Sequence, residues 1–367
     1  MCASFARGLI MEKNENPFIL AFGEVPEIML DEEARSKIIL NDIKASRPNI
    51  RNFMISGLRG SGKTVLLRSI QEALSKEKEY IFVNLDMGDG KTKDLLSQFA
   101  AILANIPEMK SLYLKADIRI GLGSAEIIME KDNPFIDIRT EIAKMLGVLK
   151  KLNKKIVIMI DEIIDNDAVA SFASAYKELT NAYPVYLIMA GLKENTDNIV
   201  NNPVNTFLRR AYPIRLEGLN ITLIREKYEK IFRISHEEAE TLASLTHRYS
   251  FAFQALGYAY YEYGKEKFLD EYDNLLGLFV YNPLWDKLSV KDKKILIGIN
   301  KAIKEGNGRA ITADVLNKCN LKKNEYSPYR KRLISSSIIS NTEMGVVTYN
   351  YPRFDVFIDN MERKYEE

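Results

Sequence analysis

The chain has 367 residues, enough for two or three domains of ordinary size. Hydrophobic residues make up 46%, and 52 basic against 50 acidic residues leave a net charge of +2, so any nucleic-acid-binding surface must be local. The two cysteines and two histidines lack metal-ligand spacing, which argues against a zinc site and fits a reducing cytosol.

No long apolar segment interrupts the chain. The apolar runs are too short to span a bilayer, and the N-terminus has no secretory pattern, so we expect a cytoplasmic protein without a membrane partner. Either Met1 or Met11 could be the start. We expect residues 1–47 to form an irregular segment followed by a helix from Asp31 to Ala45.

A glycine-rich loop follows the first strand of the next region. It spans Gly57, Leu58, Arg59, Gly60, Ser61, Gly62, Lys63 and Thr64, preceded by an apolar run and followed by Val65 and helical apolar spacing. In the order strand, turn, helix, this is the G-x-x-x-x-G-K-[ST] phosphate-binding loop, or Walker A motif. Lys63 would contact the β- and γ-phosphates, and the Thr64 hydroxyl would bind Mg²⁺. The alternative is a glycine-rich turn that binds nothing.

Strands and helices alternate over residues 48–217. Buried strands are expected at Tyr80–Leu85, 155–160 and Val185–Gly191, with a short last strand at Tyr212–Leu216. The intervening helices, near 136–151 and 168–181 among them, predict an α/β core with a parallel sheet covered on both faces. Alternation around Ile118 to Leu122 predicts a β-hairpin inserted within 112–130.

Two acids end the strand at 155–160. Asp161 would hold Mg²⁺ as the Walker B aspartate, and Glu162 would orient or deprotonate the attacking water, since both follow a strand at the sheet edge beside the loop. Two acids at a helix start are the simpler alternative.

Asn84, near the end of the neighbouring strand, could restrain Glu162 or be an ordinary strand-end residue. Arg209 and Arg210 could act as arginine fingers in a neighbouring copy or be solvated surface residues.

Beyond residue 218 the strands disappear. Residues 218–280 predict a small helical domain, with Ser235 and Glu238 as a capping box and a helix over 251–264. Residues 283–367 predict three helices and a β-hairpin, the order of a winged helix. Ser289 caps the first helix, Thr312 the second, and Ser327-Pro328 opens the third.

Basic residues gather at the third of these helices. Such a concentration of positive charge at one helix is typical of a DNA-binding module, so duplex DNA is the expected partner. The expected DNA-binding residues are five basic residues and one serine: Lys322, Lys323, Ser327, Arg330, Lys331 and Arg332. A winged helix that contacts another protein is the alternative.

Taken together, the chain resembles the AAA+ ATPases, in particular prokaryotic ATP-binding proteins similar to origin-recognition initiator ATPases. Besides the loop and the Asp-Glu pair, the resemblance rests on Asn16-Pro17-Phe18, residues 189–192, 207–211 and 253–257, and the winged helix. It implies ATP and Mg²⁺ as cofactors, a lid over the nucleotide, assembly into homo-oligomers and a switch role for Asn84. Two departures weaken the expectation of fast hydrolysis. The strand ending at Gly191 has no polar first-sensor residue, and the lid helix lacks the second-sensor arginine unless Arg248 supplies it.

We therefore expect an ATPase that couples ATP binding and hydrolysis to assembly on, or remodelling of, DNA. The alternatives are a nucleotide-dependent signalling switch whose winged helix contacts protein, and an ATP-binding protein that hydrolyses slowly.

Overall fold

The structure is a computed structural model that describes residues 15–366 except 22, 31, 89–93, 111–137, 307 and 344. The β-hairpin predicted within 112–130 and the two candidate start methionines lie outside the described residues.

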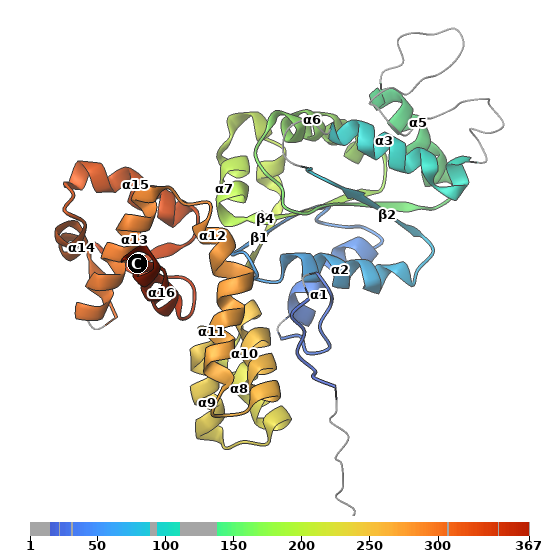
Figure 1. The fold of residues 1–367 in the computed structure, drawn as a ribbon. Helices are drawn as coiled ribbons and strands as arrows, with labels where there is room; N and C mark the ends of the chain where they lie inside the picture. The colour runs from blue at the N-terminus through green and yellow to red at the C-terminus, as the bar shows by residue number, and fades with distance from the viewer. Residues whose placement is uncertain are drawn as a thin grey trace, which may run out of the picture.

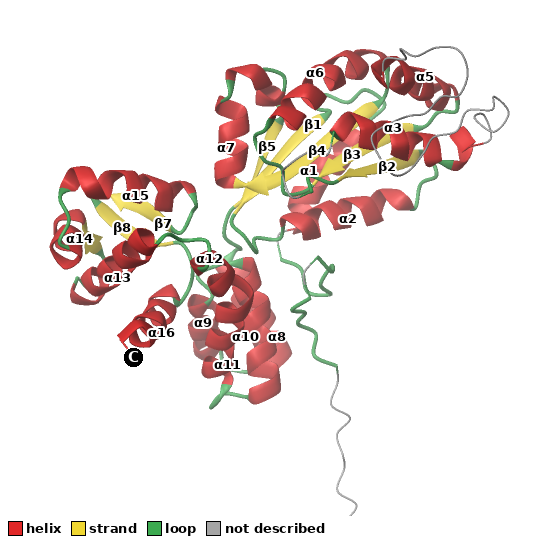
Figure 2. Ribbon diagram, turned by 45° about the horizontal axis from the view of Figure 1, so that its top comes forward, coloured by secondary structure: helices red, strands yellow, loops and turns green. Residues whose placement is uncertain are grey.

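A parallel sheet of five strands forms the centre of the N-terminal half (Figures 1 and 2). Its strand order is β2-β3-β4-β1-β5, and every neighbouring pair is parallel. The strands are β1 (Asn52–Gly57), β2 (Tyr80–Leu85), β3 (Lys155–Ile160), β4 (Val185–Leu192) and β5 (Tyr212–Leu216). β3 and β4 are buried almost throughout because both sheet faces are covered, as their unbroken apolar runs predict.

Helices cover both faces of this sheet (Figure 1). Buried side chains between helices and sheet form two separate apolar cores. One core lies under α1 (Glu32–Lys44) and α2 (Lys63–Ser75). The other lies under α3 (Leu95–Asn105), α5 (Ile138–Lys151), α6 (Asp167–Ala182) and α7 (Lys193–Asn201). Two 3₁₀ turns, Pro203–Asn205 and Leu208–Arg210, lead from α7 into β5. The α/β class predicted from the sequence is confirmed.

Four helices follow the sheet and form the lid, the name used here for residues 221–276. They are α8 (Ile221–Phe232), α9 (His236–Leu245), α10 (Ser250–Tyr263) and α11 (Phe268–Leu276). The Ser235 hydroxyl accepts the Glu238 N–H at the start of α9, which is one half of the predicted capping box. The other half would be a bond from the Ser235 N–H to the Glu238 carboxylate, and this carboxylate has other partners. The Glu238 carboxylate instead binds the Tyr260 hydroxyl at 2.8 Å and Lys265 at 3.0 Å.

The C-terminal module, residues 290–366, combines helices with a small antiparallel sheet in the order β6-β8-β7 (Figure 2). A π-helical turn (Gly277–Tyr281) and α12 (Asn282–Trp285) connect it to the lid. Its elements are α13 (Val290–Glu305), β6 (Ala310–Ile311), α14 (Thr312–Cys319), α15 (Lys323–Ser335), β7 (Ile339–Glu343), β8 (Val346–Tyr349) and α16 (Phe354–Glu366).

Two predicted helix starts in this module are wrong. Ile311 is the N-cap residue of α14, and the Thr312 hydroxyl instead donates to the Gly345 carbonyl of the β-hairpin turn. α15 begins at Lys323, so Pro328 lies inside it. The Glu325 carboxylate accepts the Lys322 N–H and starts the helix before Pro328. By contrast, the predicted Ser289 cap of α13 is present, with a complete capping box.

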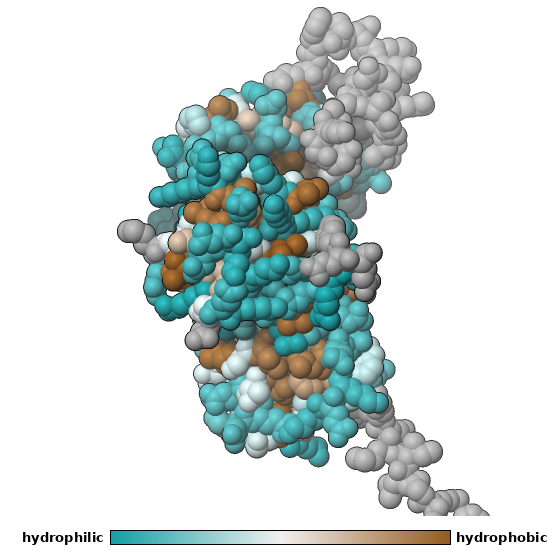
Figure 3. Space-filling model, turned by 60° about the vertical axis from the view of Figure 1, so that its left-hand side comes forward, coloured by the Kyte–Doolittle hydropathy of each residue, from teal (hydrophilic) through white to brown (hydrophobic). Residues whose placement is uncertain are grey.

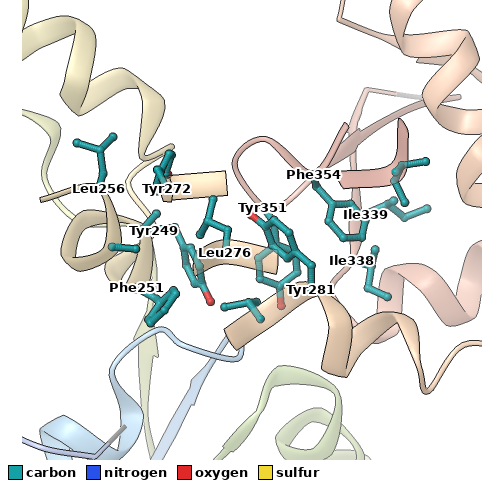
Figure 4. Close-up of a cluster of buried hydrophobic side chains, with 14 of the residues drawn as sticks. Tyr249, Phe251, Leu256, Tyr272, Leu276, Tyr281, Ile338, Ile339, Tyr351 and Phe354 are labelled. Carbon is teal, nitrogen blue, oxygen red and sulfur yellow. The ribbon is translucent and has the colours of Figure 1, made fainter. Parts of the chain in front are cut away.

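The lid and the C-terminal module share one apolar core. Buried side chains form an unbroken cluster from Phe18 through the lid helices to Ile358 in α16. Aromatic rings are numerous where the two parts meet, including those of Tyr249, Tyr281 and Tyr351 (Figure 4). The lid and the C-terminal module are therefore in direct contact through buried side chains.

Candidate functional site

The glycine-rich loop joins β1 to α2 in the conformation that its sequence predicts. Gly60 and Gly62 have φ values of +74° and +92°, which disfavour residues with a Cβ. At Gly57 a Cβ would lie 2.4 Å from Ser61 Oγ. The loop therefore needs glycine at these three positions to fold back over the start of α2.

Lys63 lies buried at the start of α2 and spans the loop. Its Nζ donates to the carbonyl oxygens of Leu58 at 2.7 Å and Gly57 at 3.4 Å. Burial lowers the pKa of Lys63 to about 8, although the charges of Asp161 and Glu162 oppose this shift. An ammonium group in such surroundings gains strongly from an added anion, because the anion compensates the lost solvation.

Thr64 and Asp161 meet at the carboxyl edge of the sheet. The Thr64 hydroxyl donates to Asp161 Oδ2 at 2.6 Å, although the two residues are 97 positions apart. A hydroxyl and a carboxylate are hard oxygen ligands of the type that Mg²⁺ takes, with water and phosphate oxygens completing its shell. These two residues therefore fit a magnesium ion.

Glu162 follows Asp161 in an unusual backbone conformation. Its φ of +52° lies in the left-handed region, and its N–H donates to Asp161 Oδ1 at 2.9 Å. Non-glycine residues in this region are often found at functional sites. The next residue, Ile163, is anchored by its N–H to the Ala190 carbonyl at 2.8 Å, which fixes the whole turn against β4.

A cleft of about 610 Å³ runs from these residues toward the lid. Its lining includes the loop, Asp161 and Glu162, together with residues 19–21, residues 28–30 and the start of α10. Ser61 Oγ, which is buried here, has no hydrogen-bond partner among the described residues. The cleft has the size of a small-ligand site and is lined by both polar and apolar side chains, so it fits a nucleotide.

Gln254 lines the cleft and joins α10 to the segment before α1. Its side chain accepts the Ile19 N–H at 3.1 Å and donates to the Ile28 carbonyl at 2.9 Å. Phe18 packs against Gly257, where a Cβ would lie 2.3 Å from the ring. The Asn16-Pro17-Phe18 and 253–257 segments, both singled out in the sequence, are therefore in direct contact.

Other predicted residues are not brought into the cleft. Asn84 is exposed on the edge strand, and among the described residues no hydrogen bond joins it to Glu162. Asp86, which the sequence analysis missed, lies instead beside Asp161 and Glu162 in a smaller hollow. Arg209 and Arg210 are exposed and do not line the cleft of their own chain.

Gly191, near the end of β4, has no room for a sensor side chain. A Cβ at Gly191 would lie 2.9 Å from the Ile163 carbonyl oxygen, so the turn after Glu162 excludes any larger residue there. Arg248 does not replace the second sensor, because its guanidinium donates to the carbonyls of Leu219 and Gly218. Asn195 and Lys287, which the sequence analysis did not identify, do line the cleft.

The basic residues of α15 fall into two groups. Arg332 forms an ion pair with the buried Asp292, and Arg330 donates to Asn341 Oδ1 at 2.7 Å. The rest of the predicted DNA-binding set is exposed: Lys322, Lys323, Ser327 and Lys331. Viewed from the side in Figure 3, the surface is mostly hydrophilic, with hydrophobic residues in separate patches.

Comparisons with known proteins agree with this fold. Residues 36–206 match the family model of the KAP family P-loop domain, and residues 279–358 match that of a domain of unknown function, DUF8462. No curated protein matches the sequence. In the described residues, no helix is both long and apolar enough for a membrane crossing.

Two solved structures share the fold over nearly their whole length. A Walker-type ATPase of Pyrococcus abyssi aligns with a TM-score of 0.64 at 13% identity, covering 90% of this chain and 96% of that one. The ORC2 protein of Aeropyrum pernix, in ADPNP and ADP complexes, aligns with a TM-score of 0.53 at 15% identity, covering 92% and 94%. The expected resemblance to the initiator ATPases is thus confirmed at the level of the fold, and the chain is a P-loop NTPase by fold whose residues 36–206 match the KAP family.

Proposed function

We propose that this protein binds ATP with Mg²⁺ and hydrolyses it. The hydrogen bond between Thr64 and Asp161 is the observation that carries the proposal, because it joins the phosphate-binding loop to the predicted metal-binding acid. The ORC2 protein, whose solved structure contains ADPNP and ADP, supports the same assignment through its shared fold.

Each residue of the site has a distinct role in this proposal. Lys63 and the N–H groups at the start of α2 bind the phosphates, and the helix dipole favours their negative charge. Thr64 and Asp161 hold Mg²⁺, which when bound neutralises charge on the terminal phosphates. Glu162 orients the attacking water and accepts its proton. The apolar walls near Phe251 and Phe253 hold the base.

Calorimetry on the Lys63→Ala variant tests the binding step. We expect the full chain to bind Mg-ATP at micromolar concentrations and the variant to show no binding, because the buried ammonium is lost. Lys76→Ala, which removes an exposed lysine just after the same helix, is the matched control. Unchanged affinity in Lys63→Ala would contradict the proposal.

We further propose that the C-terminal module contacts duplex DNA. Lys323, Ser327 and Lys331 are exposed and recur every four residues along α15, so they share one helix face. Together with Lys322 and Arg330, this face presents about four positive charges. Neutralising phosphates releases counterions, so the slope of log affinity against log salt should be near −4.

Fluorescence anisotropy with the full chain across a salt series tests this second step. Lys323→Ala and Lys331→Ala together should flatten the slope by about two units. Exposed lysines of α5 provide a control pair, Lys150→Ala and Lys151→Ala. Absence of binding at low salt would favour the alternative, a module that contacts a partner protein.

Slow ATP turnover is a second candidate property, because neither sensor position carries a side chain that could contact the γ-phosphate. Gly191 has no room for a side chain, and the Arg248 guanidinium donates to two backbone carbonyls. ATP would then act mainly as a switch between two states of the chain. Single-turnover measurements with Mg-ATP distinguish a switch from an efficient hydrolase.

A further inference from the structure

The phosphate-binding loop is held from outside by three consecutive residues, the N-cap residue Tyr249 and the first two residues of α10. The Tyr249 hydroxyl donates to the Arg59 carbonyl, the Phe251 N–H to the Gly60 carbonyl at 3.2 Å, and the Ser250 hydroxyl to the Ser61 carbonyl at 3.2 Å. Three successive carbonyls of the loop are therefore bound by the lid.

This arrangement determines where the loop N–H groups point. The C=O and N–H of one planar trans peptide unit point in opposite directions. Fixing the carbonyls of Arg59 and Ser61 toward α10 therefore turns the N–H groups of Gly60 and Gly62 away from it. Phosphate binding by such a loop depends on N–H groups that are already oriented.

Contact with Tyr249 is a second reason why position 60 requires glycine. A Cβ on Gly60 would lie 2.2 Å from the Tyr249 hydroxyl oxygen and 3.0 Å from its ring. The phenol thus occupies the space beside the loop that a side chain at position 60 would fill. Loop and lid are complementary at this point.

The C-terminal module reaches the same place through Tyr351. This buried residue follows β8, and its ring packs edge-on against that of Tyr249, with centroids 5.4 Å apart. Tyr281 packs against Tyr351 in turn, at 5.9 Å (Figure 4). Burial raises the pKa of Tyr351, and the charge and backbone N–H of Arg59 oppose that rise, which agrees with a position close to the loop.

We propose that Tyr249 and Tyr351 are positioning residues that hold the phosphate-binding loop and couple it to the C-terminal module. The inference rests on the proposed nucleotide binding. Because coupling between two sites is reciprocal, nucleotide binding should also alter the C-terminal module.

Nucleotide affinity of the Tyr249→Phe variant tests the first half. Losing one hydrogen bond to a loop carbonyl should weaken Mg-ATP binding roughly three- to tenfold, with the fold retained. Tyr272→Phe is the matched control, because Tyr272 is a buried lid tyrosine whose hydroxyl donates to Leu245 in the lid itself. Equal affinity in the parent, Tyr249→Phe and Tyr272→Phe would overturn the inference while leaving the proposed function intact.

The contribution of Tyr351 is tested by Tyr351→Leu, which removes the ring but keeps an apolar side chain. We expect weaker nucleotide binding, and less than additive loss in the double variant with Tyr249→Phe, because the two rings act together. Phe357→Leu is the control, since Phe357 packs on Tyr281 and Phe354 in the same core without contacting Tyr249. Equal loss of affinity in Tyr351→Leu and Phe357→Leu would indicate a general effect on stability and contradict the proposal.

Hydrogen exchange tests the coupling directly. Mg-ATP should slow amide exchange at residues 346–354 in the parent chain, and this protection should be reduced in Tyr249→Phe even when the variant is saturated with nucleotide. ATP-bound parent protein without any change at these amides would refute the coupling. A parent that binds no nucleotide would instead refute the proposed function.

Discussion

Thr64 and Asp161 are joined by a 2.6 Å hydrogen bond that spans β1 and β3, with β4 lying between these strands in the sheet. The contact depends on the parallel sheet, which brings the carboxyl ends of both strands to one edge.

The affinity for Mg-ATP should depend on pH through Lys63. Its pKa is lowered to about 8 by burial, and bound phosphates favour the charged ammonium. Affinity should therefore be constant near pH 7 and fall as the pH rises through 8, with proton uptake on binding around pH 9. Calorimetry in buffers of different ionisation enthalpy measures this uptake. Binding with no proton uptake at pH 9 would mean that Lys63 keeps an ordinary pKa.

The lowered pKa of Lys63 also affects the free energy of unfolding, which should rise with pH whereas the affinity for Mg-ATP falls. Below about pH 8 Lys63 is charged in both the folded and unfolded chains, and its burial disfavours folding. This penalty disappears as the pH rises toward 10.5, the value for the exposed side chain.

Glu162→Gln should bind ATP but hydrolyse it about a hundredfold or more slowly, because the amide cannot accept a proton from water. Steady-state phosphate release, with nucleotide affinity measured in parallel, separates the two effects. Glu217→Gln, an exposed acid outside the cleft, is the control. A variant that hydrolyses at the parent rate would assign the role of base to another group, and Asp86, which lines the same hollow as Glu162, would be the next candidate.

Arg209 and Arg210 can contribute to catalysis only from a neighbouring copy, because neither lines the cleft of its own chain. If one acts in this way, its replacement by alanine should lower turnover without changing nucleotide affinity. Turnover per chain should also rise with protein concentration in the parent. Arg215→Ala, on the exposed side of β5, is the control. Turnover independent of concentration in parent and variants would indicate a site that works in the monomer.

Arg332→Ala should reduce stability more than DNA affinity, whereas Lys331→Ala should do the reverse. Arg332 neutralises Asp292, whose side chain is only 3% exposed, and its removal leaves that carboxylate without its charged partner. We expect a loss of about 1–3 kcal/mol in the free energy of unfolding for Arg332→Ala. Denaturant unfolding and salt-dependent anisotropy on both variants check the pair. Equal stability of the two variants would contradict the structural role of Arg332.

Local pattern alone was sufficient for the features that depend on neighbouring residues in the chain. The glycines of the loop, the apolar runs of β3 and β4 and the Ser289 cap are each determined within a few residues. This is why the α/β class and the arrangement of the loop and Asp161 could be predicted. Helix starts were less secure, as Thr312 and Pro328 show, because contacts with Gly345 and Glu325 decided them.

Tertiary structure decided which chemically suitable residues meet. Asn84 and Asp86 are two positions apart, yet only Asp86 lies beside Glu162, because β2 ends at Leu85 and Asp86 belongs to the segment that follows the strand. Arg332 carries the same charge as Lys331, but Asp292 lies next to it only in the folded module. The contact of Tyr249 with the Arg59 carbonyl joins residues 190 positions apart, and no local pattern in the sequence encodes it, because packing of the lid against the loop creates it.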